Sequence, residues 1–232
     1  MGIPFINALL SDLVQLFVPK LCGSCTHRLH SFEDEWCLQC IAGLPFSSTM
    51  EQQHRIALAK KLSVRMPIRS AESLFVYDSG SSVQDILHAV KYQNAQALAL
   101  RLGQLLGRQL HAGVEDLPDV LVPVPLHPKK RKTRGYNQSL LLAQGISSAT
   151  GIPVDTELLI RNRHTPSQTG MDRTERWQNT SGAFECNKPI KAGAHIALVD
   201  DMITTGATLE ACYRAMDVPE VSVLGLAYAP DG

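Results

Sequence analysis

The sequence predicts an α/β protein in which helices cover a parallel sheet, preceded by a small metal-binding knuckle. Short apolar runs alternate with helix-like segments through the second half of the chain, which is typical of parallel sheets. One of these runs, at residues 196–199, leads into two adjacent carboxylates, a Thr/Gly loop and a further helix. Two Cys-x-x-Cys pairs stand near the N-terminus.

Composition limits the number of domains and the range of partners. The chain has 232 residues, of which 44% are apolar, and its formal net charge is zero. We expect one domain of about 150 residues with a small addition, because single domains cluster near that size. Without net charge, any affinity for nucleic acid must come from a local basic patch.

The first residues do not match a secretory signal, which needs a basic start and a small-residue cleavage site. The apolar segment 3–18 includes Asn7, Asp12 and Gln15, and it is shorter than the ~20 apolar residues of a membrane span. We expect an amphipathic helix that packs on the protein, with a membrane-surface helix as the alternative. The predicted location is therefore the cytoplasm, without a transmembrane segment.

Four cysteines form the predicted metal site: Cys22, Cys25, Cys37 and Cys40. Each Cys-x-x-Cys turn can bring two sulfur atoms to one metal, and two such pairs complete the tetrahedral thiolate set that Zn²⁺ prefers. Four protein ligands leave no position for substrate, so the zinc would be structural. Two disulfides or a redox pair are the alternatives, which are less common in the cytoplasm.

We predict three parts: an apolar helix and four-cysteine zinc ribbon at residues 1–45, a connecting helical segment at 46–69, and the main domain at 70–232. Apolar runs predict strands at residues 73–77, 120–122, 196–199 and 221–228. Helical spacing predicts helices at residues 52–62, 83–91, 95–111, 137–150 and 208–216.

The segment 196–208 is the strongest candidate site. Asp200 and Asp201 follow a buried strand, at the end of the sheet where α/β proteins bind ligands. The Thr/Gly loop then enters a helix, whose first N–H groups and dipole favour a phosphate. Gly206 permits a tight turn, and the hydroxyls of Thr204, Thr205 and Thr208 add donors.

The two carboxylates would repel a phosphate, so they should meet sugar hydroxyls or a divalent cation. A ribose 5-phosphate unit would fit both parts of the segment, because its hydroxyls could meet the carboxylates and its phosphate could meet the Thr/Gly loop. The alternative is an ordinary strand–turn–helix with exposed acids.

A basic loop follows the strand at residues 120–122. Lysine or arginine fills five of the six positions 129–134. The loop is predicted to contact a pyrophosphate, to contact nucleic acid, or to be a plain solvated surface. If the loop contacts a pyrophosphate, the candidate residues are Pro123, Val124, Pro125, Arg131 and Arg134.

The polar segment 161–179 is long and rich in cations. Loops of this length are commonly lids or binding loops, and the alternative is a disordered segment. A cationic lid would exclude water and neutralise a leaving group. The lid candidates are Arg163, Gln168, Arg173 and Arg176.

The segment 196–208 resembles the signature with which type I phosphoribosyltransferases bind phosphoribosyl pyrophosphate (PRPP). The resemblance implies a Rossmann-like sheet of that kind, with Asp200 and Asp201 on the ribose hydroxyls and Mg²⁺. It places the 5-phosphate in the loop from Thr204 to Thr208, which includes Ala207. Thr204 stands where the 6-oxopurine enzymes have an acidic residue, which argues against that subclass.

Taken with the cysteine knuckle, the Lys91-Tyr92 step and the segments 122–138 and 168–184, the chain resembles the ComF family, especially its GntX-type members. The resemblance implies a role in competence or in the use of external DNA as a nutrient. Three hypotheses follow: an enzyme that transfers ribose 5-phosphate from PRPP to an unidentified acceptor, a non-catalytic PRPP or nucleotide-binding module, and a zinc-ribbon nucleic-acid adaptor in DNA uptake. DNA or DNA-uptake proteins are the expected partners.

Overall fold

The computed structural model describes residues 21–22, 27–29, 37, 39–40, 43–44, 46, 51–92, 95–113, 116–127, 132, 134–161 and 182–230. The chain divides into two compact units, Met1–Leu44 and Pro45–Gly232. The second unit carries the sheet, and each unit is described by itself below.

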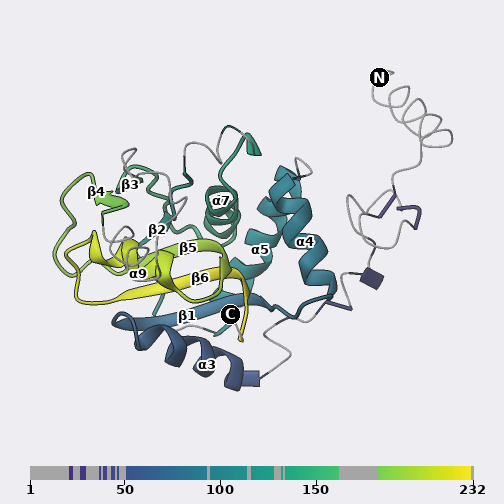
Figure 1. Cartoon of the computed structure of the whole chain (residues 1–232), viewed down its shortest axis with the longest axis horizontal. Helices are drawn as coiled ribbons and strands as arrows, with labels where there is room; N and C mark the ends of the chain where they lie inside the picture. Colours follow the sequence, from purple (N-terminus) through teal and green to yellow (C-terminus); the bar gives the residue numbers. More distant parts are fainter. Residues whose placement is uncertain are drawn as a thin grey trace, which may run out of the picture. The chain divides into compact units, whose positions relative to one another are not determined.

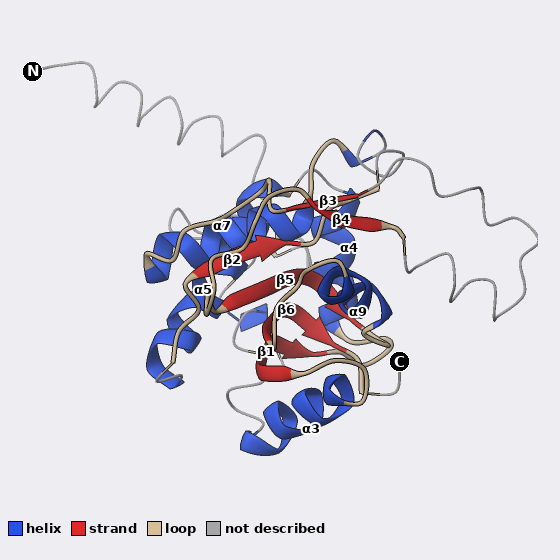
Figure 2. Ribbon diagram, turned by 90° about the vertical axis from the view of Figure 1, so that its left-hand side faces the viewer, coloured by secondary structure: helices blue, strands red, loops and turns tan. Residues whose placement is uncertain are grey.

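The second unit is built on a parallel sheet of four strands. Their order across the sheet is β1 (Ile68–Val76), β6 (Val221–Tyr228), β5 (Ile196–Ile203) and β2 (Val120–Pro123). All three pairings are parallel, and Figure 2 shows the four strands following one another in this order. The predicted α/β fold with a parallel sheet is confirmed.

Helices cover both faces of this sheet. Figure 1 shows α3 (Glu51–Ser63) below β1, and α4 (Ser82–Tyr92), α5 (Gln96–Gly113) and α7 (Gln138–Thr150) on the opposite side. The side chains of Leu58 and Leu62 in α3 are buried against the same core cluster as Leu209 and Cys212 in α9 (Ala207–Arg214). The buried, almost wholly apolar β6 fits a strand covered on both faces.

Glycines let α5 and α7 approach each other closely. A Cβ atom added at Gly145 would lie 2.1 Å from the carbonyl oxygen of Leu100 and 2.8 Å from the Cα of Gly103. A Cβ atom at Gly103 would lie 2.3 Å from the carbonyl oxygen of Leu142. Backbone therefore packs directly on backbone where these two helices cross.

A buried polar network joins the strands at the amino edge of the sheet. His195 Nε2 lies 2.7 Å from Ser222 Oγ, which in turn lies 2.7 Å from Ser70 Oγ. The backbone N–H of His195 donates to Asp119 Oδ2 at 2.8 Å. His195 Nδ1 lies 3.8 Å from Asp116 Oδ1, and burial lowers the pKa of this imidazole.

Two small strands escaped the sequence prediction. β3 (Leu159–Arg161) and β4 (Phe184–Cys186) pair antiparallel and form a sheet of their own. Strands of three residues are too short to show a periodic pattern. Leu159 and Phe184 nevertheless join the same core cluster as Leu209 and Cys212 of α9, which fixes this pair of strands to the main body.

Most predicted elements are found, but their ends differ. β1 begins at Ile68 rather than Ser73. The segment before Ser73 contains polar residues and therefore shows no apolar run, but Ser70 and Glu72 still pair with β6. β5 continues through Asp200 and Asp201 to Ile203. The predicted helix near the N-terminus lies outside the described residues.

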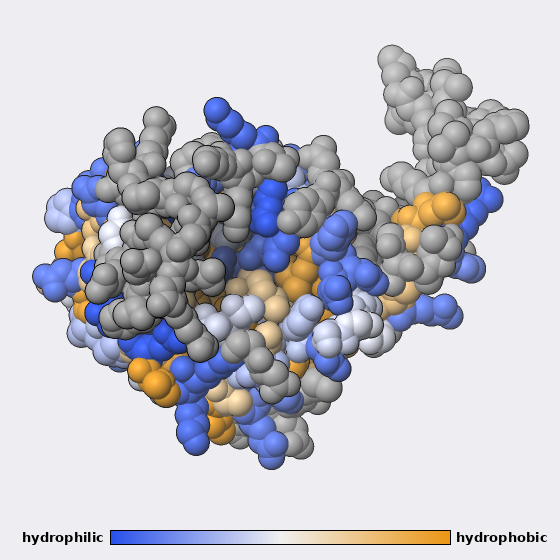
Figure 3. All heavy atoms as spheres, viewed as in Figure 1, coloured by the Kyte–Doolittle hydropathy of each residue, from blue (hydrophilic) through white to orange (hydrophobic). Residues whose placement is uncertain are grey.

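Hydropathy on the surface is mixed. Figure 3 shows small groups of apolar residues among hydrophilic ones on the face that it draws. The large apolar side chains that stay exposed among the described residues are Leu21, Ile56, Val64 and Ile160. No helix among the described residues is long and apolar enough to cross a membrane.

Candidate functional site

A pocket of about 190 Å³ opens at the carboxyl edge of the parallel sheet. It lies where β5 and β2 end and where α7 begins. Three cations and two carboxylates border it together with uncharged groups. Its lining consists of Lys91, Val124, Pro125, Leu126, Arg134, Gln138, Ser139, Arg161, Asp200, Asp201, Met202 and Thr208.

Asp200 is held at the floor of this pocket by two hydrogen bonds to one oxygen. Its Oδ1 accepts from Ser139 Oγ at 3.1 Å and from the backbone N–H of Asp201 at 2.9 Å. Burial, and then the neighbouring charge of Asp201, raise the pKa of Asp200 to about 7. The hydrogen bonds and Lys91 act in the opposite direction by favouring the ionised carboxylate.

Asp201 has a cationic partner from a distant part of the chain. The ammonium of Lys91, in the last turn of α4, lies 3.7 Å from Asp201 Oδ2. Both side chains are largely buried, with 22% of Lys91 and 16% of Asp201 exposed. A hydrogen bond of 2.6 Å from Tyr136 O–H to the Val90 carbonyl ties the end of α4 to the segment that precedes α7.

The start of α7 forms a polar wall of the pocket. Asn137 caps this helix, because its Oδ1 accepts from the Ser139 N–H at 3.2 Å, and its Nδ2 donates to the Val124 carbonyl at 3.0 Å. Gln138 Oε1 accepts from Arg134 at 3.2 Å. The buried Nε2 of Gln138 has no hydrogen-bond partner within the described part of the chain.

The loop between β5 and α9 presents its threonines to solvent. Thr204, Thr205 and Thr208 are exposed, and Thr208 also lines the pocket. Gly206 precedes α9 with a φ of +76° and offers no side-chain cap to the helix. A Cβ atom at Gly206 would lie 2.7 Å from Leu62 Cδ2 of α3, so a larger residue would have to displace this buried side chain as well as adopt a strained positive φ.

Arg161 supplies a third cation, from the end of β3. Its guanidinium carbon lies 5.0 Å from the centre of the Phe184 ring, which stacks the group in place. Burial lowers the pKa of Arg161, while the negative charge of Asp200 acts against this. The buried Nε of Arg161 finds no hydrogen-bond acceptor among the residues that the structure describes.

The structure brings part of the predicted site together. Asp200, Asp201, Thr208, Val124, Pro125 and Arg134 all line one pocket, while Pro123 ends β2 next to it. Thr204, Thr205, Gly206 and Ala207 form the neighbouring loop and the start of α9. The remaining candidates lie outside the described residues: Arg131, Arg163, Gln168, Arg173 and Arg176.

Sequence reasoning missed four polar or charged residues of the lining: Lys91, Gln138, Ser139 and Arg161. Gln138 and Ser139 stand at the start of α7, a few residues after the basic positions 129–134. The sequence could therefore have indicated that the start of this helix contributes to a ligand site. The Lys91-Tyr92 step contributed to the family resemblance and Arg161 opens the polar segment 161–179. Neither pattern placed its residue at this pocket, because only the folded chain brings α4 and β3 to this edge.

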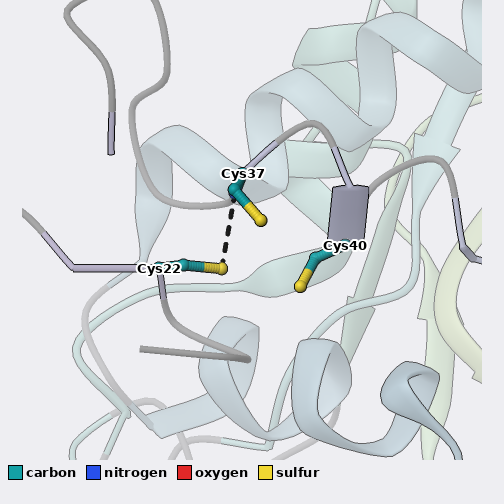
Figure 4. Close-up of side chains that lie close together, drawn as sticks. All are labelled: Cys22, Cys37 and Cys40. Atoms are coloured by element: carbon teal, nitrogen blue, oxygen red, sulfur yellow. Dashed lines mark hydrogen bonds between the residues drawn. The ribbon is translucent and has the colours of Figure 1, made fainter. Parts of the chain in front are cut away.

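The first unit contains a separate cluster of thiols. The sulfur atoms of Cys22, Cys37 and Cys40 lie within 4.8 Å of one another, and Figure 4 shows them turned toward a common point. The backbone N–H of Cys37 donates to Cys22 Sγ at 3.4 Å. Cys22 and Cys37 are buried, none of the three forms a disulfide, and Cys25 lies outside the described residues. These three thiols are close enough to bind one metal ion.

Comparisons with known proteins give a consistent set of relatives, although no family model matches the chain. Competence protein F of Haemophilus influenzae is 35% identical over 157 residues, which are 62% of this chain and 67% of the relative. DNA utilization protein YhgH of Escherichia coli is 34% identical over 139 residues, 58% of this chain and 60% of that protein. Competence protein ComFC of Bacillus subtilis is 25% identical over 197 residues, 85% of this chain and 78% of that protein.

Among solved structures, a match is found with glutamine PRPP amidotransferase from Bacillus subtilis, complexed with ADP and GMP. It is 23% identical, has a TM-score of 0.34, and covers 53% of this chain and 26% of that chain. By its identity with competence protein F over two thirds of that relative, the chain belongs to the ComF family.

Proposed function

We propose that this protein binds PRPP at the carboxyl edge of its sheet. The main observation in support of the proposal is that β5, the Thr/Gly loop and α9 follow one another directly in the chain. Two carboxylates stand in the last half of the strand, and a helix start without a side-chain cap follows within a few residues. Asp200 and Asp201 would accept hydrogen bonds from the ribose hydroxyls. The loop from Thr204 to Thr208 would hold the 5-phosphate with its hydroxyls and N–H groups.

The pyrophosphate end of the ligand is assigned to the other side of the pocket. Val124, Pro125 and Arg134, which line the pocket, are the described residues that we assign to this end. We include Pro123 and Arg131 in this subsite, and we assign the cations of the segment 161–179 to a lid. Mg²⁺ would accompany the ligand and reduce the charge of its pyrophosphate. Arginine groups would complete this neutralisation through bidentate hydrogen bonds.

The proposed chemistry is the transfer of ribose 5-phosphate to an acceptor. The bond from ribose C1 to the pyrophosphate oxygen would break, pyrophosphate would leave with the bonding electrons, and C1 would bond to the acceptor. The same site would also serve a protein that binds PRPP without turnover. Since relatives are named for competence and DNA utilization, we place the protein in the use of DNA in the cytoplasm, with DNA or DNA-uptake proteins as partners.

³¹P NMR of the purified chain with PRPP and Mg²⁺ tests this proposal. Spectra would be recorded with and without a panel of nucleobases. Release of pyrophosphate that depends on an added base would identify an enzyme and its class of acceptor. Broadened PRPP signals without turnover would identify a binding module. PRPP signals that stay unchanged at all protein concentrations would refute the site.

Replacement of both carboxylates gives the sharper test. D200N/D201N is expected to weaken PRPP binding at least about tenfold, because amides do not replace the charged acceptors. The amide at position 200 avoids the burial cost that raises the pKa of Asp200 to about 7, whereas the change at position 201 removes the partner of Lys91. Circular dichroism should therefore verify that the variant is folded before its affinity is compared. D85N/D217N removes two exposed carboxylates instead and should bind like the parent chain. Equal affinity of D200N/D201N and the parent would show that the ribose assignment is wrong.

We also propose that the thiol cluster holds structural zinc. The three described sulfur atoms have the spacing of ligands to one ion, and Cys25 is the proposed fourth ligand. Four thiolates fill a tetrahedral shell, so this metal would stabilise the first unit and would not react with substrate.

A further inference from the structure

Lys91 lies beside the carboxylate pair, for which the sequence predicts sugar hydroxyls or a divalent cation as partners. Its Nζ atom lies 3.7 Å from Asp201 Oδ2, within a pocket where little of either side chain is exposed. Limited exposure reduces screening by solvent and salt, so this pair is stronger than an ordinary surface ion pair.

The placement of Lys91 is fixed by the fold around it. In α4, Val83, Ile86, Leu87 and Val90 are buried, which sets the rotation of the helix and leaves Lys91 at the pocket. The hydrogen bond of 2.6 Å from Tyr136 O–H to the Val90 carbonyl holds the last turn of α4. Lys91 is therefore a constituent of the site rather than a surface lysine that happens to lie nearby.

Both carboxylates already have partners within the described part of the chain. Asp200 Oδ1 already accepts two hydrogen bonds, at 3.1 Å and 2.9 Å. Arg161 lies close enough to Asp200 to interact with it electrostatically, so each acid has a neighbouring cation. Mg²⁺ requires an octahedral shell of oxygen ligands, and an ion on Asp201 would also face the ammonium of Lys91.

We propose that Lys91 is the resident counter-ion of the Asp200–Asp201 pair and that it excludes free divalent cations from the site. Mg²⁺ then reaches this edge of the sheet only as a complex with an anionic ligand, on whose oxygens the metal sits. The proposal concerns the same site as the proposed function, and it rests on that function only for the identity of the ligand.

Binding of Mn²⁺ alone, followed by EPR of the free ion, tests the proposal. The full chain would be used with its cysteine cluster supplied with zinc, and without PRPP. K91M is expected to gain one Mn²⁺ site at least about tenfold tighter than any in the parent chain, because a full positive charge near the acids is removed. K91M/D201N should lose that gain, and K91R and K60M, the latter on an exposed part of α3, should behave like the parent.

Two outcomes would overturn the proposal. One is a parent chain that binds Mn²⁺ as tightly as K91M. The other is a folded K91M, with the circular dichroism spectrum of the parent, that gains no site. If K91M does not fold, K91Q serves in its place, and the K91R comparison still reports on the charge. Because the assay contains only the metal, a failure of PRPP to bind would leave its result unaffected.

Discussion

The hydroxyl of Ser139 donates a hydrogen bond of 3.1 Å to Asp200 Oδ1 and so joins the first turn of α7 to the end of β5. Because Asp200 belongs to the strand and Ser139 to a helix that covers the sheet, the position of the carboxylate depends on how these elements pack. The hydrogen bond also favours the ionised form of the carboxyl group.

Replacement of Ser139 with Ala is expected to raise the pKa of Asp200 further, by roughly one pH unit, because a hydrogen bond to the charged form is lost. The ¹³C chemical shift of the carboxyl carbon, followed through a pH titration, measures the effect. Ser148→Ala is the matched control, since that hydroxyl donates to the Gly145 carbonyl within α7. An unchanged titration in Ser139→Ala would mean that the hydrogen bond does not form in solution.

Stability is expected to fall at acidic pH through His195. Burial, and then the charge of Arg69, lower the pKa of this imidazole, while Asp116 and Asp119 oppose the shift. The folded state therefore binds fewer protons than the unfolded state. The contribution of His195 is complete above the unfolded pKa of about 6.5 and is lost as the pH falls below it.

Urea unfolding at about pH 7.5 and about pH 5.5 would measure this loss. The parent should lose more stability between the two conditions than His195→Gln, which cannot take up the proton. His111→Gln, on the exposed side of α5, should retain the pH dependence of the parent. Equal losses in the parent and His195→Gln would assign the acid sensitivity to other groups.

Gly145→Ala is expected to destabilise the second unit by about 3 kcal/mol, since the new methyl group would overlap the backbone of α5. Thermal unfolding followed by circular dichroism measures the change. Gly182→Ala is the control, because a Cβ atom there meets no atom within 4 Å. If the two variants unfold at the same temperature as the parent, the helices must be further apart than described.

Cys37→Ser is expected to release the proposed zinc from the first unit, because a hydroxyl is a poor replacement for the buried thiol of Cys37 as a metal ligand. Zinc content after dialysis, measured by mass spectrometry, provides the test. Cys186→Ser changes a thiol of the second unit that donates to the Lys188 carbonyl, and it should leave the zinc content unchanged. Full retention of zinc by Cys37→Ser would exclude Cys37 as a ligand.

The apolar runs predicted the central strands well, because a parallel strand that is buried on both faces consists of consecutive apolar residues. The continuation of β5 through Asp200 and Asp201 was not predictable in this way. Asp200 stands opposite Gly225 of β6. This pairing depends on the alignment of two strands in the folded chain, which the local sequence around Asp200 does not indicate. The two acids are therefore held by a rigid strand rather than by the loop.

The same distinction applies to the site. The strand, the acids, the Thr/Gly loop and the helix are consecutive in sequence, so their chemistry could be predicted as one segment. Lys91 and Arg161 come from elements far from that segment. Their roles depend on an ion pair and on stacking against Phe184, which are tertiary contacts. Local patterns carry no information about such contacts.

The central place of β6 has a consequence for the order in which this protein is made. β1 and β5 are joined only through β6 in the four-stranded sheet, and β6 is the last of the described strands along the chain. While a ribosome is still synthesising residues 204–220, β1 has no neighbouring strand to pair with. Until β6 has been made, the edge of β1 that pairs with it must stay open or be shielded by a chaperone, although α3 and α5, which pack against β1, precede β6 in the chain. Synthesis halted before β6 would therefore leave an aggregation-prone fragment rather than a smaller folded domain.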